Sequence, residues 1–174
     1  MEPKQLKRRF NVKNLFSVII ITCIVFFAGC SNSPNPIVFG EDNCDNCKMT
    51  ITDSKYGAEL ITSKGKIYKY DSIECLADVI KKNKFGKEDI SSLWVVDFNN
   101  PGNFISAENA HYLKNDKFHS PMGLNVLAVE SDADISKIYN LHGGEILKWE
   151  LVKNYSDMPA SKKSSSQNCC PEDE

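Results

Sequence analysis

The sequence has no strong excess of either charge and few of the residues on which common enzyme mechanisms depend. Lysine and arginine number 21, aspartate and glutamate 23, and the net charge is −2. Because the charges are interspersed, we expect no nucleic-acid partner. The 174 residues include three histidines and no phosphate-binding loop, nicotinamide-binding motif or hydrolytic triad. They are also too few for a large enzyme with a separate cofactor domain. An enzymatic function would rest on one pair of cysteines alone, and we therefore expect that the protein is not an enzyme.

Long hydrophobic runs are scarce, with one exception near the N-terminus. Several basic residues precede an apolar run over residues 15–29, which ends at Cys30. This run is shorter than a membrane-spanning helix and is typical of a signal peptide. Phe27-Ala28-Gly29-Cys30 resembles a bacterial lipobox, in which the cysteine is lipidated and becomes the mature N-terminus. We therefore expect residues 1–29 to be a lipoprotein signal peptide and Cys30 to anchor the chain to the cell membrane on the periplasmic side. An ordinary cleaved signal or an uncleaved anchor would also place the chain outside the cytoplasm.

The remaining chain divides by composition into three parts. Residues 30–40 hold the lipidated cysteine and a linker rich in Pro, Ser and Asn, and residues 41–155 have enough apolar content for one compact domain. Residues 156–174 are polar and rich in Ser and Lys, which predicts a disordered tail. The tail carries the adjacent pair Cys169-Cys170, from which we infer no site because neighbouring residues are difficult to bridge without strain.

The first half of the domain predicts a β-β-α-β unit over about residues 57–99. Residues 59–62 and 66–70 flank a Ser-Lys-Gly turn and indicate a hairpin. Residues 71–74 offer an N-cap at Asp71 with Glu74 three positions later, and apolar residues follow at helical spacing. Residues 93–98 form an apolar strand.

The second half, about residues 103–153, predicts the same order of elements. Residues 104–114 and 125–129 indicate strands, a helix capped at Ser131-Asp132 follows, and residues 146–152 alternate as a strand does. Each unit is too small to stand alone. The expected fold class is therefore α+β, with two tandem β-β-α-β modules packed as one compact unit.

A short motif, Cys44-Asp-Asn-Cys47-Lys-Met49, carries two thiols and a thioether within six residues. Met122 lies in a second polar turn, His119-Ser-Pro-Met-Gly123. Thiolate and thioether sulfurs are the ligands that Cu(I) prefers, whereas Zn²⁺ favours four Cys or His ligands and Mg²⁺ or Ca²⁺ favour oxygen. Cys44, Cys47, Met49 and Met122 therefore form a candidate Cu(I) site.

Each of these residues also has a simpler interpretation. Cys44 and Cys47 could form a structural disulfide, or a redox pair, although residues 50–52 indicate a strand where redox motifs usually begin a helix. Met122 could fill a gap in the packing. His119 could add an imidazole ligand or be a solvated loop residue, and His111 and His142 fit structural positions better. Cys75 points away from the apolar stripe of its helix, so it could face the other module, supply a further sulfur or lie exposed.

The motifs together resemble the NosL family of nitrous-oxide-reductase accessory lipoproteins. The resemblance rests on the lipobox, the Cys-x-x-Cys-x-Met element, the segment Tyr70-Asp-Ser-Ile-Glu-Cys-Leu76 and the turn Ser120-Pro-Met-Gly123. It implies that Cys47, Met49 and Met122 bind Cu(I). It also implies delivery of copper to the copper-sulfide centre of nitrous oxide reductase, alongside an ABC-type maturation complex. In the family a glycine usually occupies the position of Lys48, and residues 169–170 match nothing in it.

Three classes of function remain open at this stage: a Cu(I) metallochaperone, a thiol-disulfide oxidoreductase of the cell envelope, and an interaction lipoprotein stabilised by a disulfide or by zinc. A copper carrier should lose affinity when Met49 and Met122 are changed to Leu, whereas an oxidoreductase should not. A zinc site should need Cys75 or a histidine as well and should unfold on chelation.

Overall fold

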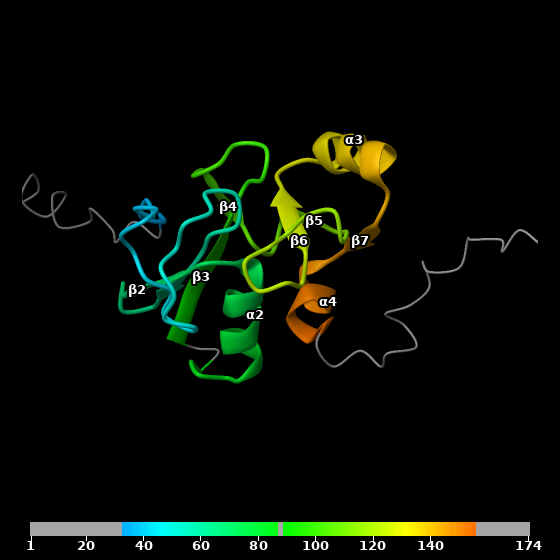
Figure 1. Ribbon diagram of the computed structural model, residues 1–174. Coiled ribbons are helices and arrows are strands. Elements are labelled where there is room, and N and C mark those ends of the chain that lie inside the picture. The colour runs from blue at the N-terminus through cyan, green and yellow to red at the C-terminus, as the bar shows by residue number, and fades with distance from the viewer. Residues whose placement is uncertain (1–32, 87–88, 156–174) are drawn as a thin grey trace, which may run out of the picture. The chain divides into compact units, whose positions relative to one another are not determined.

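The computed structural model describes residues 33–86 and 89–155. The expected signal peptide, the lipid attachment at Cys30 and the expected tail over residues 156–174 lie outside the described residues. In the part of the chain that is described, the strands form two small antiparallel sheets accompanied by short helices (Figure 1). No helix there has the length and apolar character needed to cross a membrane.

The first sheet is built around strand β1 (Ala58–Thr62), which is buried along its whole length. Strand β2 (Ile67–Tyr70) forms the predicted hairpin with β1, and helix α2 (Ile73–Lys81) leads to strand β3 (Ile90–Val96), which pairs with the other edge of β1. A short strand β4 (Phe104–Ser106) completes the order β2-β1-β3-β4. The predicted β-β-α-β order is therefore present in this half.

The second sheet repeats this arrangement. Strands β5 (His111–Lys114) and β6 (Val126–Val129) form a hairpin, helix α3 (Asp132–His142) follows, and strand β7 (Glu145–Leu147) pairs with the free edge of β5. Strands β5, β6 and β7 correspond to β1, β2 and β3, so the order β6-β5-β7 is the same as the order β2-β1-β3 in the first sheet. Ser131 caps α3 as the sequence predicts, since its hydroxyl accepts a hydrogen bond from the Asp134 amide. The α+β fold class is confirmed.

Both halves contribute to the larger hydrophobic core. Leu60 and Leu76 of the first half and Tyr112 and Val126 of the second are buried in the same cluster. Helix α2 contacts β1 and β2 of its own half and β6 of the other. Burial of apolar area is the main stabilising contribution to a domain of this size. The helix that carries Cys75 is therefore packed by both halves of the chain.

Two predicted strands differ from the structure. Residues 104–114 form β4 and β5, which belong to different sheets and are separated by a turn. Residues 146–152 were expected to form one strand, but the strand ends at Leu147 and helix α4 (Trp149–Asn154) follows. Trp149 and Val152 are buried at a spacing of three while Leu151 is exposed. The helical spacing prevails because α4 packs against α2, a contact that local alternation does not reveal.

Candidate metal centre

The Cys-x-x-Cys-x-Met motif forms a tight turn beside the first sheet. Its ends are joined by a bridge between Asn43 and Thr50. The strand expected over residues 50–52 is not among the strands of the described residues; Ile51 instead donates its amide to the Asp42 carbonyl and accepts from the Gly40 amide. Inside the turn the Cys44 amide donates to the Met49 carbonyl at 2.8 Å, and the Lys48 amide donates to the Cys44 carbonyl at 2.9 Å. These bonds fold the turn so tightly that the Cys47 amide lies 3.5 Å from the Cys44 sulfur.

Lys48 occupies a backbone conformation that favours glycine. Its φ angle is +68°, in the left-handed region, where a side chain costs about 1 kcal/mol relative to glycine. The turn therefore has a backbone geometry suited to glycine, with a lysine in that position. The Lys48 side chain donates a hydrogen bond to the Asp45 carbonyl at 2.8 Å, but this contact is exposed.

Lys48→Gly should therefore raise the stability of the fold. We expect a gain of about 0.5–1 kcal/mol in the free energy of unfolding, seen as an increase of about 2–4 °C in Tm. Thermal denaturation followed by circular dichroism measures it. Lys48→Ala is the matched control, since it also removes the side-chain hydrogen bond and keeps the strained φ. A gain with alanine equal to that with glycine would contradict this explanation.

The third cysteine comes from the first turn of α2. Ser72 is the N-cap, and its hydroxyl accepts a hydrogen bond from the Cys75 amide at 3.3 Å. The sequence predicts Asp71 as the cap. Instead Asp71 directly precedes the cap residue, is buried, and accepts a hydrogen bond from the Ser72 hydroxyl at 3.2 Å. Cys75 is 1% exposed, although its helix position points away from the apolar stripe. It is buried because the turn that holds Cys44 covers this face of the helix.

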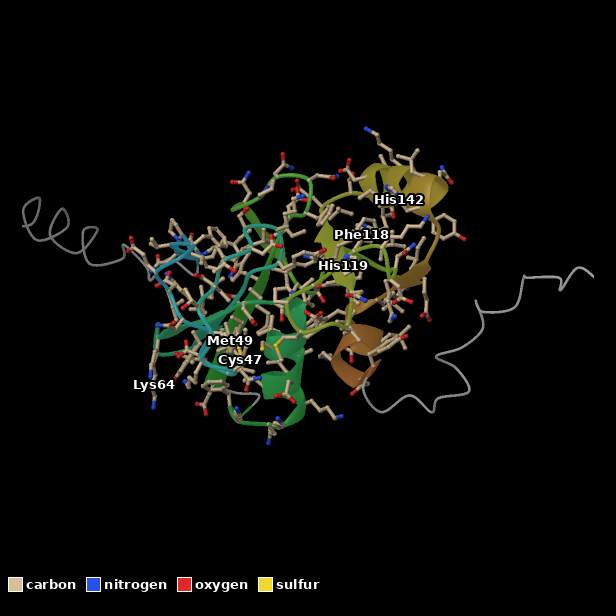
Figure 2. The ribbon with its side chains drawn as sticks, in the orientation of Figure 1. Cys47, Met49, Lys64, Phe118, His119 and His142 are labelled. Carbon is tan, nitrogen blue, oxygen red and sulfur yellow. The ribbon has the colours of Figure 1, made fainter. Side chains whose placement is uncertain are left out.

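These segments bring four possible ligand atoms together. One atom from each of Cys44, Cys47, Asp71 and Cys75 lies within 4.8 Å of the other three. Cys44 and Cys75 are buried free thiols, and Cys47 is a partly exposed free thiol. Figure 2 shows the labelled Cys47 together with Met49 on the side of the molecule that carries α2 and β2. The cluster is thus open towards solvent at Cys47 and closed at its other two sulfurs.

Hydrogen bonds and burial inside the cluster shift the pKa values of the three thiols in different directions. The Cys75 thiol donates to Cys44 and lowers the pKa of Cys44 to about 6, whereas the same interaction and burial raise the pKa of Cys75. Burial raises the pKa of Cys47, whose thiol donates to the Asp71 carboxylate at 3.4 Å. Of the three sulfurs, Cys44 is therefore the one that most favours the thiolate form. A soft metal ion binding there would displace thiol protons.

The two candidate methionines are both accessible. Met49 is 57% exposed and Met122 is 46% exposed, which argues against a packing role for either side chain. Met122 and Cys75 line the same cavity, which has a volume of about 480 Å³ and lies between α2, α4 and the turn after Ser120. An ion held near Cys75 can therefore be approached through the side that carries Met122.

Glu74 fixes the Met122 turn to helix α2. Its carboxylate accepts hydrogen bonds from the Ser120 hydroxyl and from the Leu124 amide, the second at 3.1 Å. The side chain is largely buried, which raises its pKa. Because Glu74 directly precedes Cys75, the same turn of helix positions a cluster thiol and the loop that carries Met122.

The structure separates the remaining candidates. His119 is exposed and belongs to none of the ligand groups found among residues 33–86 and 89–155, and Figure 2 shows it apart from Cys47 and Met49. His142 lies in the last turn of α3 with its ring against Phe118. The Nδ1 atom of His111 lies 3.1 Å from Oδ1 of Asp132.

Asp71 is the cluster residue that the sequence pattern does not identify as a ligand. Its position in an apparent helix cap gave no signal of a ligand.

Comparison with known proteins identifies the family of the chain. The NosL family model matches residues 37–156, which includes every described residue of the cluster. Comparison with curated proteins gave no match. Among solved structures, the copper chaperone NosL from Shewanella denitrificans is similar at a TM-score of 0.58 and 18% sequence identity, over 67% of this chain and 93% of that one. At this identity the second likeness shows the fold alone. The family match covers more than half of the chain, and the protein is a member of the NosL family.

Proposed function

We propose that the protein is a membrane-anchored Cu(I) metallochaperone that delivers copper on the extracytoplasmic side of the cell membrane. The observation that carries the proposal is the convergence of sulfur ligands: three thiols within 4.8 Å of one another, with an exposed methionine two residues after Cys47 and a second one on a cavity shared with Cys75. Soft sulfur donors select Cu(I) over oxygen-loving cations. The similar structure from Shewanella denitrificans is described as a copper chaperone.

The geometry favours carriage of the ion. Cys47 is partly exposed and both methionines are accessible, so an incoming ligand can reach an ion held by Cys47, Met49 and Met122. Copper can then leave by exchange of one sulfur ligand for another, without release into water. A closed four-ligand site of the structural zinc type would resist this transfer.

The proposed client is nitrous oxide reductase, together with an ABC-type maturation complex. This part rests on the family and on the expected lipid anchor at Cys30. An anchor confines the carrier to the membrane surface, which raises its effective concentration near membrane partners.

The alternative of a thiol-disulfide oxidoreductase finds support in one feature, the lowered pKa of Cys44. A reactive thiolate must also reach its substrate, and Cys44 is 0% exposed. The exposed thiol of the motif is Cys47, whose pKa is raised. The acidic thiol and the accessible thiol are therefore different residues, which disfavours exchange with a substrate disulfide.

Titration with Cu(I) tests the proposal. The full chain in detergent, reduced and free of oxygen, should take at least one equivalent of Cu(I) from a competing chelator. Met49→Leu and Met122→Leu should each lower the affinity about tenfold, close to 1.4 kcal/mol, because a leucine of similar volume has no donor atom. Met158→Leu is the matched control, since residue 158 lies outside the family match. Failure of the chain to compete with the chelator, or equal affinities for all four proteins, would refute the assignment.

A further inference from the structure

Two of the three clustered thiols are not needed by the exposed site. A position made by Cys47, Met49 and Met122 leaves Cys44 and Cys75 as a buried, hydrogen-bonded pair of sulfurs beside Cys47. Both cysteines belong to the larger hydrophobic core. Apolar packing does not account for the buried carboxylate of Asp71, which is 3% exposed and has an oxygen within 4.8 Å of all three sulfurs.

The spacing of the sulfurs suits a soft metal ion. With metal–sulfur bonds of about 2.3 Å, two sulfurs on opposite sides of one ion lie about 4.6 Å apart, and three around one ion lie about 4.0 Å apart. All three sulfurs of the cluster lie within 4.8 Å of one another. Small side-chain shifts would therefore bring Cys44 and Cys75 onto one ion, with Cys47 close enough to share.

Charge favours two ions once all three sulfurs bind copper. The three sulfurs then carry three negative charges as thiolates, and two Cu(I) ions compensate one more of these charges than a single ion does. Uncompensated charge is costly in a buried site, and the Asp71 carboxyl lies beside these sulfurs. The cluster is therefore better neutralised by two Cu(I) ions than by one.

We propose that the chain carries a second Cu(I) ion, held by Cys44 and Cys75 and bridged through the Cys47 sulfur to the ion at the methionine position. This inference rests on the proposed copper-carrying function and extends it from one ion to a pair. Binding forms copper–sulfur bonds to Cys44 and Cys75 and breaks the sulfur–hydrogen bond of each protonated thiol. The protons go to solvent, and copper remains Cu(I) throughout.

The cavity gives this inner ion a route to the surface. Cys75 and Met122 both line it, together with Asn46 of the cysteine turn. After the outer ion leaves, the inner ion can move to Cys47 and Met122 by exchanging its bonds to Cys44 and Cys75 for bonds to the exposed ligands. The same exit then serves both ions, and one chain delivers two coppers in sequence.

The number of Cu(I) ions bound per chain tests the proposal. The measurement uses the full chain in detergent with serine at the four cysteines outside the described residues, which are Cys23, Cys30, Cys169 and Cys170. Competition against a Cu(I) chelator should show about two equivalents in this background and about one after Cys75→Ser. Ala77→Ser is the matched control, because it places a hydroxyl at another buried position of α2 and leaves the thiols intact; it should keep both equivalents.

A second measurement needs no substitution within the cluster. With selenomethionine in place of methionine, copper X-ray absorption distinguishes thioether neighbours, now selenium, from thiolate sulfur. The first equivalent should show copper–selenium contacts, and the second should add an ion with sulfur neighbours and a short copper–copper distance. Saturation at one equivalent, with the selenium signal present, would overturn the second ion while leaving the chaperone function intact. Absence of Cu(I) binding altogether would instead refute the function itself.

Discussion

Cys47→Ser should lower the affinity for Cu(I) of the position made by Cys47, Met49 and Met122 by at least about 100-fold, or about 2.8 kcal/mol. Cys47 supplies the anionic ligand of that position, and the two methionines that remain are neutral thioethers. It is also the one cluster thiol with appreciable exposure, since Cys44 and Cys75 are buried. Stopped-flow transfer of Cu(I) to a chelator in excess measures the ion that leaves rapidly, and this rapid phase should be lost.

The control for this substitution is a serine at Cys169, a thiol far along the chain from the cluster. It should leave the rapid phase unchanged. An ion still held by Cys44 and Cys75 in the Cys47→Ser variant would leave slowly, because the buried pair must first open locally before a ligand reaches it. A variant that transfers its Cu(I) as fast and as completely as the parent chain would show that Cys47 is not the exit ligand.

Glu74→Ala should both destabilise the fold and weaken Cu(I) binding. The substitution leaves the Ser120 hydroxyl and the Leu124 amide without their carboxylate partner, and two partly buried donors without an acceptor cost about 2–3 kcal/mol. The turn that holds Met122 would also lose its attachment to α2. We therefore expect a fall in Cu(I) affinity close to that of Met122→Leu, measured in the same competition titration, with unfolding followed by chemical denaturation.

Glu74→Gln separates the two effects of this residue. Glutamine keeps an oxygen that accepts from Ser120 and Leu124 and removes the charge that burial disfavours. The cost to stability should be below about 1 kcal/mol, and Cu(I) affinity should stay near that of the parent chain. Equal losses of Cu(I) affinity in the alanine and glutamine variants would show that the charge of Glu74, and not its attachment of the loop, acts on the metal.

The chain order of the cluster residues was visible in the sequence, but the cluster itself was not. Cys44, Cys47 and Met49 were identified by their spacing, and Met122 by a turn in which a methionine has no packing role. The sequence leaves the role of Cys75 undetermined, because a helical wheel counts only the apolar stripe of its own helix. The turn that buries it starts 31 residues earlier in the chain, and no local period reports a contact at that distance. The proximity of Asp71 to Cys44 and Cys47 has no local signal in the sequence either, because the cysteine turn is also distant from it along the chain.

The elements of the fold followed a similar rule. The hairpins and the helices α2 and α3 were predictable because their turn residues, caps and periods agree with one another. Helix α4 was predicted as strand because seven residues of alternating character satisfy the two-residue period as well as the three-residue one. Its contact with α2 decides between them, and that contact joins residues about seventy positions apart. The pairing of β4 with β3 is likewise set by the sheet edge that β3 leaves open.

The candidate ligands come from segments that are distant in the chain. Cys44, Cys47 and Met49 belong to a turn before β1, Cys75 belongs to the helix of the first repeat, and Met122 lies in the connection between the two strands of the second hairpin. An ion that joins them binds the assembled fold more tightly than the unfolded chain, which keeps only the local ligands of the segment 44–49. Each tenfold rise of available metal above the dissociation constant then adds at most about 1.4 kcal/mol to the free energy of unfolding. In the proposed carrier, copper would in this sense cross-link the two repeats. We therefore expect the chain that has given up its copper to unfold locally and to be degraded more readily than the copper-bound chain.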